Sequence, residues 1–366
     1  MKRRDFVTGV LAGSALLAGC NEQTADNSST TAKPKKVIKW KMVTTWPKDF
    51  PGLGTGANNL ARLIGEMSGG RLQVKVYGAK DLVPAFGVFD AVAQGTTELG
   101  HGAAYYWKGK SEAAQFFTSV PFGMTAQEMN AWLYYGDGLK LWTELYKPFG
   151  IVPFPAGNMG VQMGGWFNKE INTVADLNGL KMRIPGLGAE VLKKLGGTPV
   201  NLPGGELFTS LQSGAIDATE WVGPYNDLAF GFYKIAKHYY YPGWHEPGSV
   251  LECIVNEKAL KALPEDLQVI VESACKIVNQ DMLAEFTAKN NQALDTLVNV
   301  HKVDLRPFPN DVLKQFLSLS MEAAADVSNR DPNAKKIFDS FMGFRSQVMN
   351  YHKISEQAFL NARSPV

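Results

Sequence analysis

Hydrophobic and polar positions follow two periods along the chain, one typical of strands and one typical of helices. Residues 37–45 are rich in β-branched side chains and residues 71–77 alternate between apolar and polar, which predicts two strands. Amphipathic spacing predicts helices at 58–68 and 86–94, followed by a short strand from 97 to 100. This order favours a mainly parallel sheet with helices on both faces.

The same pattern returns in the second half of the chain. It predicts a short helix at 173–177, a strand at 180–184, helices at 189–195 and 206–212, and a strand at 215–219. We therefore expect two similar α/β lobes.

Ligands of such sheets bind beyond the carboxyl ends of the strands. That rule directs attention to residues 101–107 in the first lobe and 220–225 in the second.

The last hundred residues change to helical spacing, with predicted helices at 263–300, 309–329 and 334–360. The third helix carries an apolar stripe. Its members are Ile337, Phe338, Phe341, Phe344, Val348, Tyr351, Ile354 and Ala358. Packing on the helix's own lobe explains such a stripe, and a partner helix in a homodimer is the alternative.

Charge and length narrow the class of protein. At 366 residues the chain is long enough for two domains. Its net charge of +2 is matched by an excess of two positive charges within residues 1–19, so the remainder is close to neutral. A neutral body lacks the basic surface that nucleic-acid binding requires.

Residues 1–19 have the features of a signal peptide: a cationic start, a short apolar run and small residues near the end. The apolar run, residues 6–19, is shorter than the roughly 20 residues of a membrane-spanning helix, which disfavours the alternative of a membrane anchor. Cys20 closes a segment that resembles a lipobox, so we expect it to be acylated. Arg3 and Arg4 resemble a twin-arginine export signal.

Residues 20–36 are polar and predict a flexible tether between the lipid and the body, outside the cytoplasm. Acylation of Cys20 leaves Cys253 and Cys275. These two could pair in an oxidising compartment, although two buried thiols are the interpretation we favour. The cysteines and histidines show no CxxC or other metal-ligand spacing.

Known catalytic and nucleotide-binding motifs are absent from the sequence: it holds no G-x-S-x-G elbow, HExxH pair or Walker loop. Nothing in the sequence requires an enzyme. Unusual polar residues occur instead near predicted strand ends. Gln162 stands among glycines, Arg183 lies inside an apolar strand, and Glu220 and Glu246 lie in turns rich in aromatic residues.

An arginine in an apolar strand needs a partner. A structural ion pair with a buried carboxylate is one explanation. Several such features at one predicted cleft edge favour the other, a site for a small anion.

Three stretches carry a resemblance to a known family: GVQMGGWFNKEINTVADLNGLKMRIPG, AIDATEWVGPYND and YYYPGWHEPG. They resemble the extracytoplasmic solute-binding proteins of TRAP transporters (the DctP-like family), in the branch that binds 2-oxo acids or lactate. The resemblance implies a two-lobed α/β fold with the ligand between the lobes. We accordingly expect lobe I at 37–155, lobe II at 156–250, and at 251–366 a return strand and helices that pack on both lobes.

The resemblance also implies residue roles. Arg183 matches an arginine that holds the substrate carboxylate through two hydrogen bonds. Gln162, Glu220 and Trp221, the last through its backbone, match ligands of a metal ion that also touches the substrate. Glu246 matches a further acidic residue of this site. The residues implied to contact substrate are Arg183, Gln162, Tyr105, Tyr106, Trp221 and Glu246, and those implied to hold the metal are Gln162, Glu220, Trp221 and Glu246.

His245 departs from the expected pattern, because a relative has another aromatic residue there.

The charges at the expected site bear on the identity of the ion. One arginine, two glutamates and a monocarboxylate leave two negative charges in a dry cleft, which calcium would neutralise and sodium would halve. The count favours calcium over sodium. A single arginine also disfavours dicarboxylates.

The expected function is therefore that of a TRAP receptor that binds a small monocarboxylate with a metal ion and delivers it to membrane permease subunits. Two alternatives remain open: an exported enzyme acting on small carboxylates, and a sensor that presents its ligand to a signalling partner. All three share one fold, so the fold does not separate them.

Overall fold

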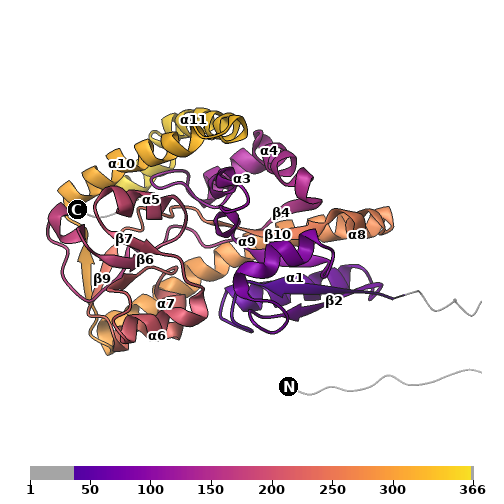
Figure 1. Cartoon of the computed structure of the whole chain (residues 1–366), viewed down its shortest axis with the longest axis horizontal. Helices are drawn as coiled ribbons and strands as arrows, with labels where there is room; N and C mark the ends of the chain where they lie inside the picture. The colour runs from indigo at the N-terminus through magenta and orange to yellow at the C-terminus, as the bar shows by residue number, and fades with distance from the viewer. Residues whose placement is uncertain (1–36, 364–366) are drawn as a thin grey trace, which may run out of the picture. The chain divides into compact units, whose positions relative to one another are not determined.

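Two mixed sheets carry the fold (Figure 1). The computed structural model describes residues 37–363, so the predictions for the signal peptide, the tether and Cys20 lie outside the described residues. The first sheet has the strand order β2 (Leu72–Tyr77), β1 (Ile38–Thr44), β3 (Leu99–Gly102), β10 (Val250–Asn256), β4 (Ile151–Asn158). The second has the order β11 (Asp304–Pro307), β9 (His238–Tyr241), β5 (Gly165–Phe167), β8 (Ala218–Thr219), β6 (Lys181–Arg183), β7 (Thr198–Val200).

The two-lobed α/β class predicted from the sequence is confirmed, but the sheets are less parallel than the pattern indicated. β10 runs antiparallel to both β3 and β4, and β5 runs antiparallel to both β8 and β9. These are the strands that follow the first two of the three crossings between the sheets. The third crossing runs through α9 to β11, which is parallel to β9. A chain that leaves one sheet at the cleft and enters its neighbour there runs in the opposite direction, which local periodicity does not reveal.

Helices cover the sheets on both sides. The α-helices of the described residues are α1 (Leu53–Met67), α2 (Val88–Ala93), α3 (Ala126–Tyr135), α4 (Gly138–Tyr146), α5 (Gly186–Lys194), α6 (Leu207–Gln212), α7 (Pro224–Phe230), α8 (Glu257–Lys261), α9 (Glu265–Asp295), α10 (Asn310–Ser328), α11 (Pro332–His352) and α12 (Glu356–Arg363). Shorter turns are η1 (Ala85–Gly87), η2 (Ala104–Trp107), η3 (Glu112–Phe117), η4 (Lys147–Phe149), η5 (Val174–Leu177), η6 (Gly204–Glu206), η7 (Phe232–Lys234) and the π-turn Thr296–Val300.

Helix α1 begins five residues before the predicted start, because its first turns contain glycines that suggest a loop. Gly56 lies where the side chain of Met282 packs on α1. A Cβ built on Gly56 would lie 2.3 Å from the Met282 methyl group of α9. A small residue here therefore lets α9 approach α1 closely.

The long helix α9 packs on α1 and β4 of the first lobe and on α7 of the second. Farther along the chain, α10 packs on α5, whereas α11 packs on α3 and α4 (Figure 1). The C-terminal helices therefore contact both lobes.

The predicted helix at 334–360 is two helices, since α11 ends at His352 and α12 begins at Glu356. Its stripe also divides. Ile337 and Phe341 are buried in the core, whereas Tyr351 and Ile354 are 65% and 79% exposed. Phe338, Phe344 and Val348 pack against the core as well, so core packing explains the stripe as far as Val348.

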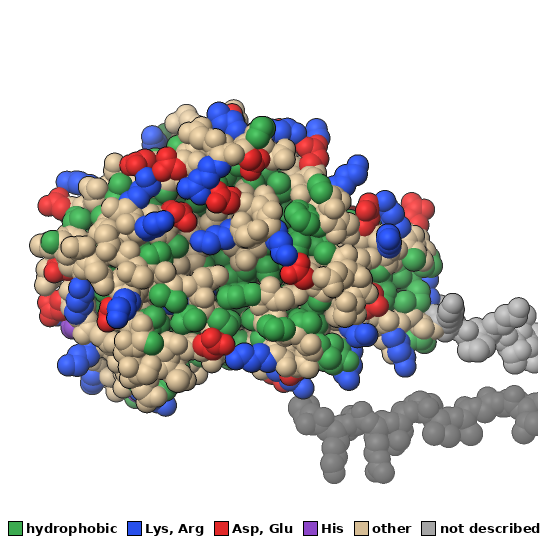
Figure 2. Space-filling view, in the orientation of Figure 1, with side chains coloured by type: hydrophobic (Ala, Val, Ile, Leu, Met, Phe, Trp, Pro, Cys, Tyr) green, Lys and Arg blue, Asp and Glu red, His purple; other side chains and the backbone are tan. Residues whose placement is uncertain are grey.

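Both remaining cysteines, Cys253 and Cys275, are buried free thiols, as the sequence favoured. Across residues 37–363, no helix combines the length and apolarity needed for a bilayer span. On the face drawn in Figure 2, acidic and basic side chains are interspersed rather than gathered by sign.

One buried carboxyl in the first lobe affects stability without belonging to the cleft. Glu252 of β10 is fully buried, and it accepts a hydrogen bond from the indole of Trp107 at the end of η2. Burial raises the pKa of Glu252 from 4.5 to about 8. The folded protein therefore keeps this carboxyl protonated at neutral pH, while the unfolded chain releases the proton.

This difference predicts stability that declines with rising pH. Because the folded state binds the proton more tightly, the stabilisation is fully present below the unfolded pKa and is lost as pH rises through about 8. Thermal unfolding measured from about pH 5 to about pH 9 should show the decline. Glu252→Gln, which has no proton to lose, should make the decline shallower without removing it, because burial also raises the pKa values of Glu246 and Asp227 to about 7. A variant with the wild-type slope would contradict this assignment.

Candidate ligand and metal site

The candidate site forms where two strand ends and the two crossing segments meet. Arg183 is the last residue of β6, and Glu220 follows β8 directly, with the parallel strands in register at Arg183 and Thr219. The crossing segment 159–164 joins β4 to β5 and supplies Gln162. The returning segment 242–249 joins β9 to β10 and supplies Glu246. Residues distant in sequence thus converge at carboxyl ends of strands, where α/β folds bind ligands.

A buried ion pair between the Arg183 guanidinium and the Glu220 carboxylate lies at the centre. The side chains are 1% and 0% exposed. Arg183 also donates to the Glu220 carbonyl (3.1 Å), to the Leu202 carbonyl (3.1 Å) and to the Tyr106 hydroxyl (3.3 Å). Its guanidinium carbon lies 5.1 Å from the centre of the Trp221 ring. The arginine in an apolar strand therefore has the partner that its burial demands.

A second polar cluster joins the two crossing segments. The Gln162 side-chain amide donates to a Glu246 carboxylate oxygen at 2.7 Å, and the Ser249 hydroxyl donates to the same oxygen. The backbones are tied as well, because the Gln162 amide donates to the Glu246 carbonyl at 3.1 Å and the Gly243 amide donates to the Gln162 carbonyl at 2.9 Å. Gly243 is obligatory here, since a Cβ would lie 2.2 Å from that carbonyl oxygen.

The glycines around Gln162 allow close contacts within the protein. A Cβ on Gly164 would lie 2.3 Å from the Phe308 ring, and one on Gly165 would lie 2.7 Å from the Thr219 carbonyl. Gly165 also has a φ of +115°, which favours glycine. These glycines bring protein segments close to one another and do not demonstrate approach to a ligand.

The donor set fits a hard cation. One donor atom each from Glu220, His245 and Glu246 lie within 4.8 Å of one another, and all three residues are buried. The Gln162 side-chain carbonyl oxygen is buried with no hydrogen-bond partner. Burial, and after it the charge of Glu220, raises the pKa of Glu246 to about 7. Two close carboxylates and an unpartnered amide oxygen are ligands that calcium or sodium accepts.

Aromatic side chains line the other side of this charge cluster. Tyr105 and Tyr106 of η2 are buried and meet edge to face at 4.7 Å. Trp46 lies 6.3 Å from Tyr106 and 6.2 Å from Trp221, as ring centres, and so joins the two lobes. Burial, and after it the charge of Glu246, raises the pKa of Tyr105 well above its usual value, so its hydroxyl remains a neutral donor.

The structure thus brings all the predicted site residues into one buried cluster. Two members of this cluster had no role predicted from the sequence, in which His245 stood out only as a departure from the family pattern. His245 lies 3.3 Å from a Glu220 carboxylate oxygen, and its Nδ1 atom is buried without a partner. Trp46 donates from its indole nitrogen to His101 at 2.8 Å. The only sequence signals were the position of His245 next to Glu246 and the position of Trp46 just after the first strand.

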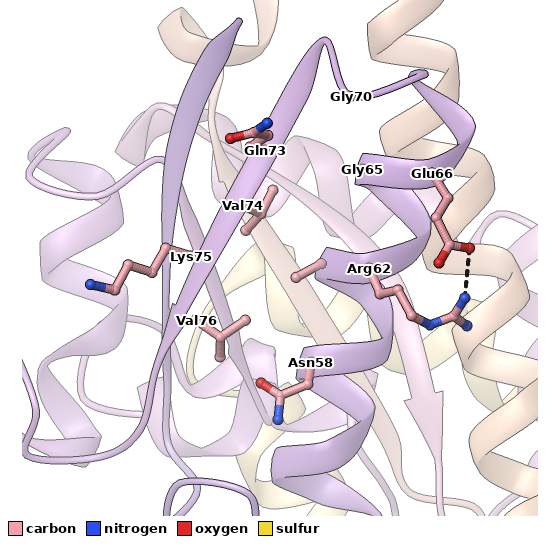
Figure 3. Close-up of a pocket in the computed structure, with 10 residues that line it drawn as sticks. Asn58, Arg62, Gly65, Glu66, Gly70, Gln73, Val74, Lys75 and Val76 are labelled. Atoms are coloured by element: carbon pink, nitrogen blue, oxygen red, sulfur yellow. Dashed lines mark hydrogen bonds and ion pairs between the residues drawn. The ribbon is translucent and has the colours of Figure 1, made fainter.

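A surface depression between α1 and the edge strand β2 is a weaker candidate (Figure 3). Arg62 and Glu66 there form an exposed ion pair within one helix. Lys75 points away from α1 in this view. The depression lacks the buried, converging polar groups found around Arg183.

Comparisons with known proteins agree with the geometry. Residues 42–330 match the DctP family, described as bacterial extracellular solute-binding protein, family 7. The chain is 40% identical over 366 residues to the monocarboxylate 2-oxoacid-binding periplasmic protein of a Nostoc species, covering all of this chain and 99% of that protein. The resemblance found in the sequence is confirmed.

Two solved TRAP periplasmic solute-binding proteins are similar along nearly the whole described chain. That of Pseudoalteromonas atlantica, with bound sodium and pyruvate, is 46% identical with a TM-score of 0.88, over 90% of this chain and 100% of that one. That of Colwellia psychrerythraea, with bound calcium and pyruvate, is 44% identical with a TM-score of 0.87, over 89% of this chain and 100% of that one.

The buried ion pair leads to a prediction about stability. In metal-free protein, Arg183→Met leaves the Glu220 carboxylate without its cationic partner and should lower the free energy of unfolding by about 3–5 kcal/mol. Adding Glu220→Gln to that variant removes the stranded charge and should recover much of the loss. Urea titrations of the wild type, both single variants and the double variant measure this. Additive losses would argue against the coupling.

Proposed function

This chain belongs to the DctP family of bacterial extracellular solute-binding proteins, and from that premise we propose that it binds a small monocarboxylate with one metal ion as the receptor of a TRAP transporter. The ligand class is a 2-oxo acid such as pyruvate, or lactate. The observation that carries the proposal is the buried Arg183 beside two carboxylates and an unpartnered amide oxygen.

Arg183 is the proposed anchor for the ligand carboxylate. Its guanidinium is held by Leu202 and Glu220 on one side, while its longest polar contact, at 3.3 Å, is with the Tyr106 hydroxyl. A ligand carboxylate could take that position on Nη2. The second of two parallel hydrogen bonds would come from Nη1 once the Glu220 carboxylate turns from Arg183 to the ion. Tyr105 and Tyr106 would then cover the ligand from the first lobe, and Trp221 from the second.

Gln162, Glu220 and Glu246 would supply side-chain oxygens to the ion, and Trp221 its backbone carbonyl. The ion would supply positive charge against which the ligand oxygens bind. With both glutamates ionised, calcium brings the ligand, Arg183 and the two carboxylates to neutrality, which is why we propose calcium ahead of sodium. The solved relatives with pyruvate contain either ion.

We further propose export, anchoring and assembly from the sequence. Acylation of Cys20, export through the twin-arginine route and handing of the ligand to permease subunits follow from the predicted leader and the family. Intact-mass measurement of the exported protein tests the lipid on Cys20.

The exposed Tyr351 and Ile354 near the end of α11 would meet a second copy of the chain. Sedimentation of the wild type beside Tyr351→Asp tests that contact.

The central prediction is binding that requires the ion. Chelated protein should give no tryptophan-fluorescence response to pyruvate or lactate, because the carboxylates of Glu220 and Glu246 would repel the ligand. Calcium, and less strongly sodium, should restore a saturable response, since Trp221 and Trp46 adjoin the site. Succinate should give only a weak fluorescence response. Pyruvate that binds equally well after chelation would overturn the metal proposal.

The same titration tests the proposed anchor. Arg183→Met removes the partner of a buried ligand carboxylate, a loss of about 3–5 kcal/mol, or roughly 100- to several-thousand-fold in affinity. Arg306→Met is the matched control, because Arg306 is a lobe II arginine that pairs at the surface with Glu170 and Asp304. Its affinity should equal that of the wild type. Undiminished binding by Arg183→Met would remove that residue from the site.

A further inference from the structure

The returning segment 242–249, which carries Glu246, is hydrogen-bonded to Phe122 of the first lobe. The Phe122 amide donates to the Trp244 carbonyl at 2.8 Å, two residues before Glu246. The Phe122 carbonyl in turn accepts two hydrogen bonds from Arg345 of α11, at 3.1 Å from Nε and 2.8 Å from the terminal nitrogen. A continuous path of hydrogen bonds thus runs from α11 to the returning segment 242–249.

Phe122 has the backbone conformation expected of a strained connector. Its φ is +52°, in the left-handed region that residues with a side chain seldom adopt. Its amide and its carbonyl each have a partner, Trp244 and Arg345 respectively. Such conformations persist where surrounding contacts determine them, and Arg345 donates both hydrogen bonds that the Phe122 carbonyl accepts.

The residues along this path are closely packed. A Cβ built on Gly248 would lie 2.5 Å from the Thr125 backbone, so the returning segment lies directly against residues 124–126. The Trp244 ring stacks on Phe316 of α10 at 4.1 Å. A shift of Phe122 would therefore be passed to the returning segment and to the Glu246 carboxylate.

We propose that Arg345 is a positioning residue for Glu246, and through it for the metal ion and the monocarboxylate. This inference rests on the proposed function. Arg345 itself does not bind the ligand. It fixes Phe122, which fixes the Trp244 carbonyl, and this holds Glu246 against Gln162 and Ser249. Residues that orient the ligands of a metal commonly change affinity by 10–100-fold when removed.

Docking of α11 does not depend on Arg345. Ile337 and Phe341 are buried in the core, the Trp132 indole donates to Ser340 at 3.1 Å, and His352 lies 2.6 Å from Glu128. Removing Arg345 should leave the helix in place. A change in binding would then report the path to Glu246 and not a detached helix.

The test compares full-length Arg345→Met, Arg345→Lys and the control Arg330→Met, whose arginine pairs with Glu112 at the surface. With saturating calcium, Arg345→Met should raise the pyruvate Kd about tenfold at a melting temperature near that of the wild type. Arg345→Lys keeps one donor for Phe122 and should recover most of the affinity. Arg330→Met should bind like the wild type. Equal Kd values for Arg345→Met and Arg330→Met would overturn the inference.

Hydrogen exchange separates this inference from the proposed function. Arg345→Met should speed exchange in peptides covering residues 159–164 and 242–249, because the Gln162 amide donates to the Glu246 carbonyl. Arg330→Met should not. If the wild type does not bind pyruvate, the proposed function is wrong. The hydrogen-exchange rates then still show whether Arg345 holds the returning segment in place. If Arg345→Met does not fold, Arg345→Lys decides: a Kd raised about twofold with faster exchange supports the inference, and wild-type values refute it.

Discussion

A cation and a carboxylate buried together impose the constraint on which the rest of the site depends. Arg183 and Glu220 are almost wholly inaccessible, so each must be satisfied by groups that the fold supplies. β6 and β8 are parallel neighbours in register, which places the two side chains at adjacent strand ends. The Leu202 carbonyl and the Tyr106 hydroxyl provide further acceptors. The pair leaves negative charge in excess once Glu246 is added, and that excess makes the site suited to a cation.

The first two of the three crossings between the sheets explain why the remaining ligands meet at this point. Segment 159–164 leaves the first sheet and segment 242–249 returns to it, and their backbones bond to each other at Gln162, Gly243 and Glu246. The strands that follow the crossings, β5 and β10, run against the others in their sheets. The site therefore lies where the lobes are joined, and Trp46 and Tyr106 reach it from the first lobe.

Much of this arrangement could be predicted from the sequence, and the exceptions have physical reasons. Arg183 in an apolar strand required a partner, and the sequence left open whether that partner was a buried carboxylate or a small anion. The roles of the site residues were predicted from the family resemblance, because local spacing does not show which distant segments come into contact. The antiparallel β10, and the contact of His245 with Glu220, depend on tertiary crossings. The break before α12 and the early start of α1 are local features that periodicity alone did not resolve.

Crystals grown with calcium and pyruvate would test the account most directly, through anomalous diffraction from the ion. The account predicts one peak within ligand distance of the Gln162 side-chain oxygen and the Glu220 and Glu246 carboxylates, with the pyruvate carboxylate on the Arg183 guanidinium. An ion bound away from Gln162 and Glu220, or a ligand whose carboxylate does not contact Arg183, would contradict it.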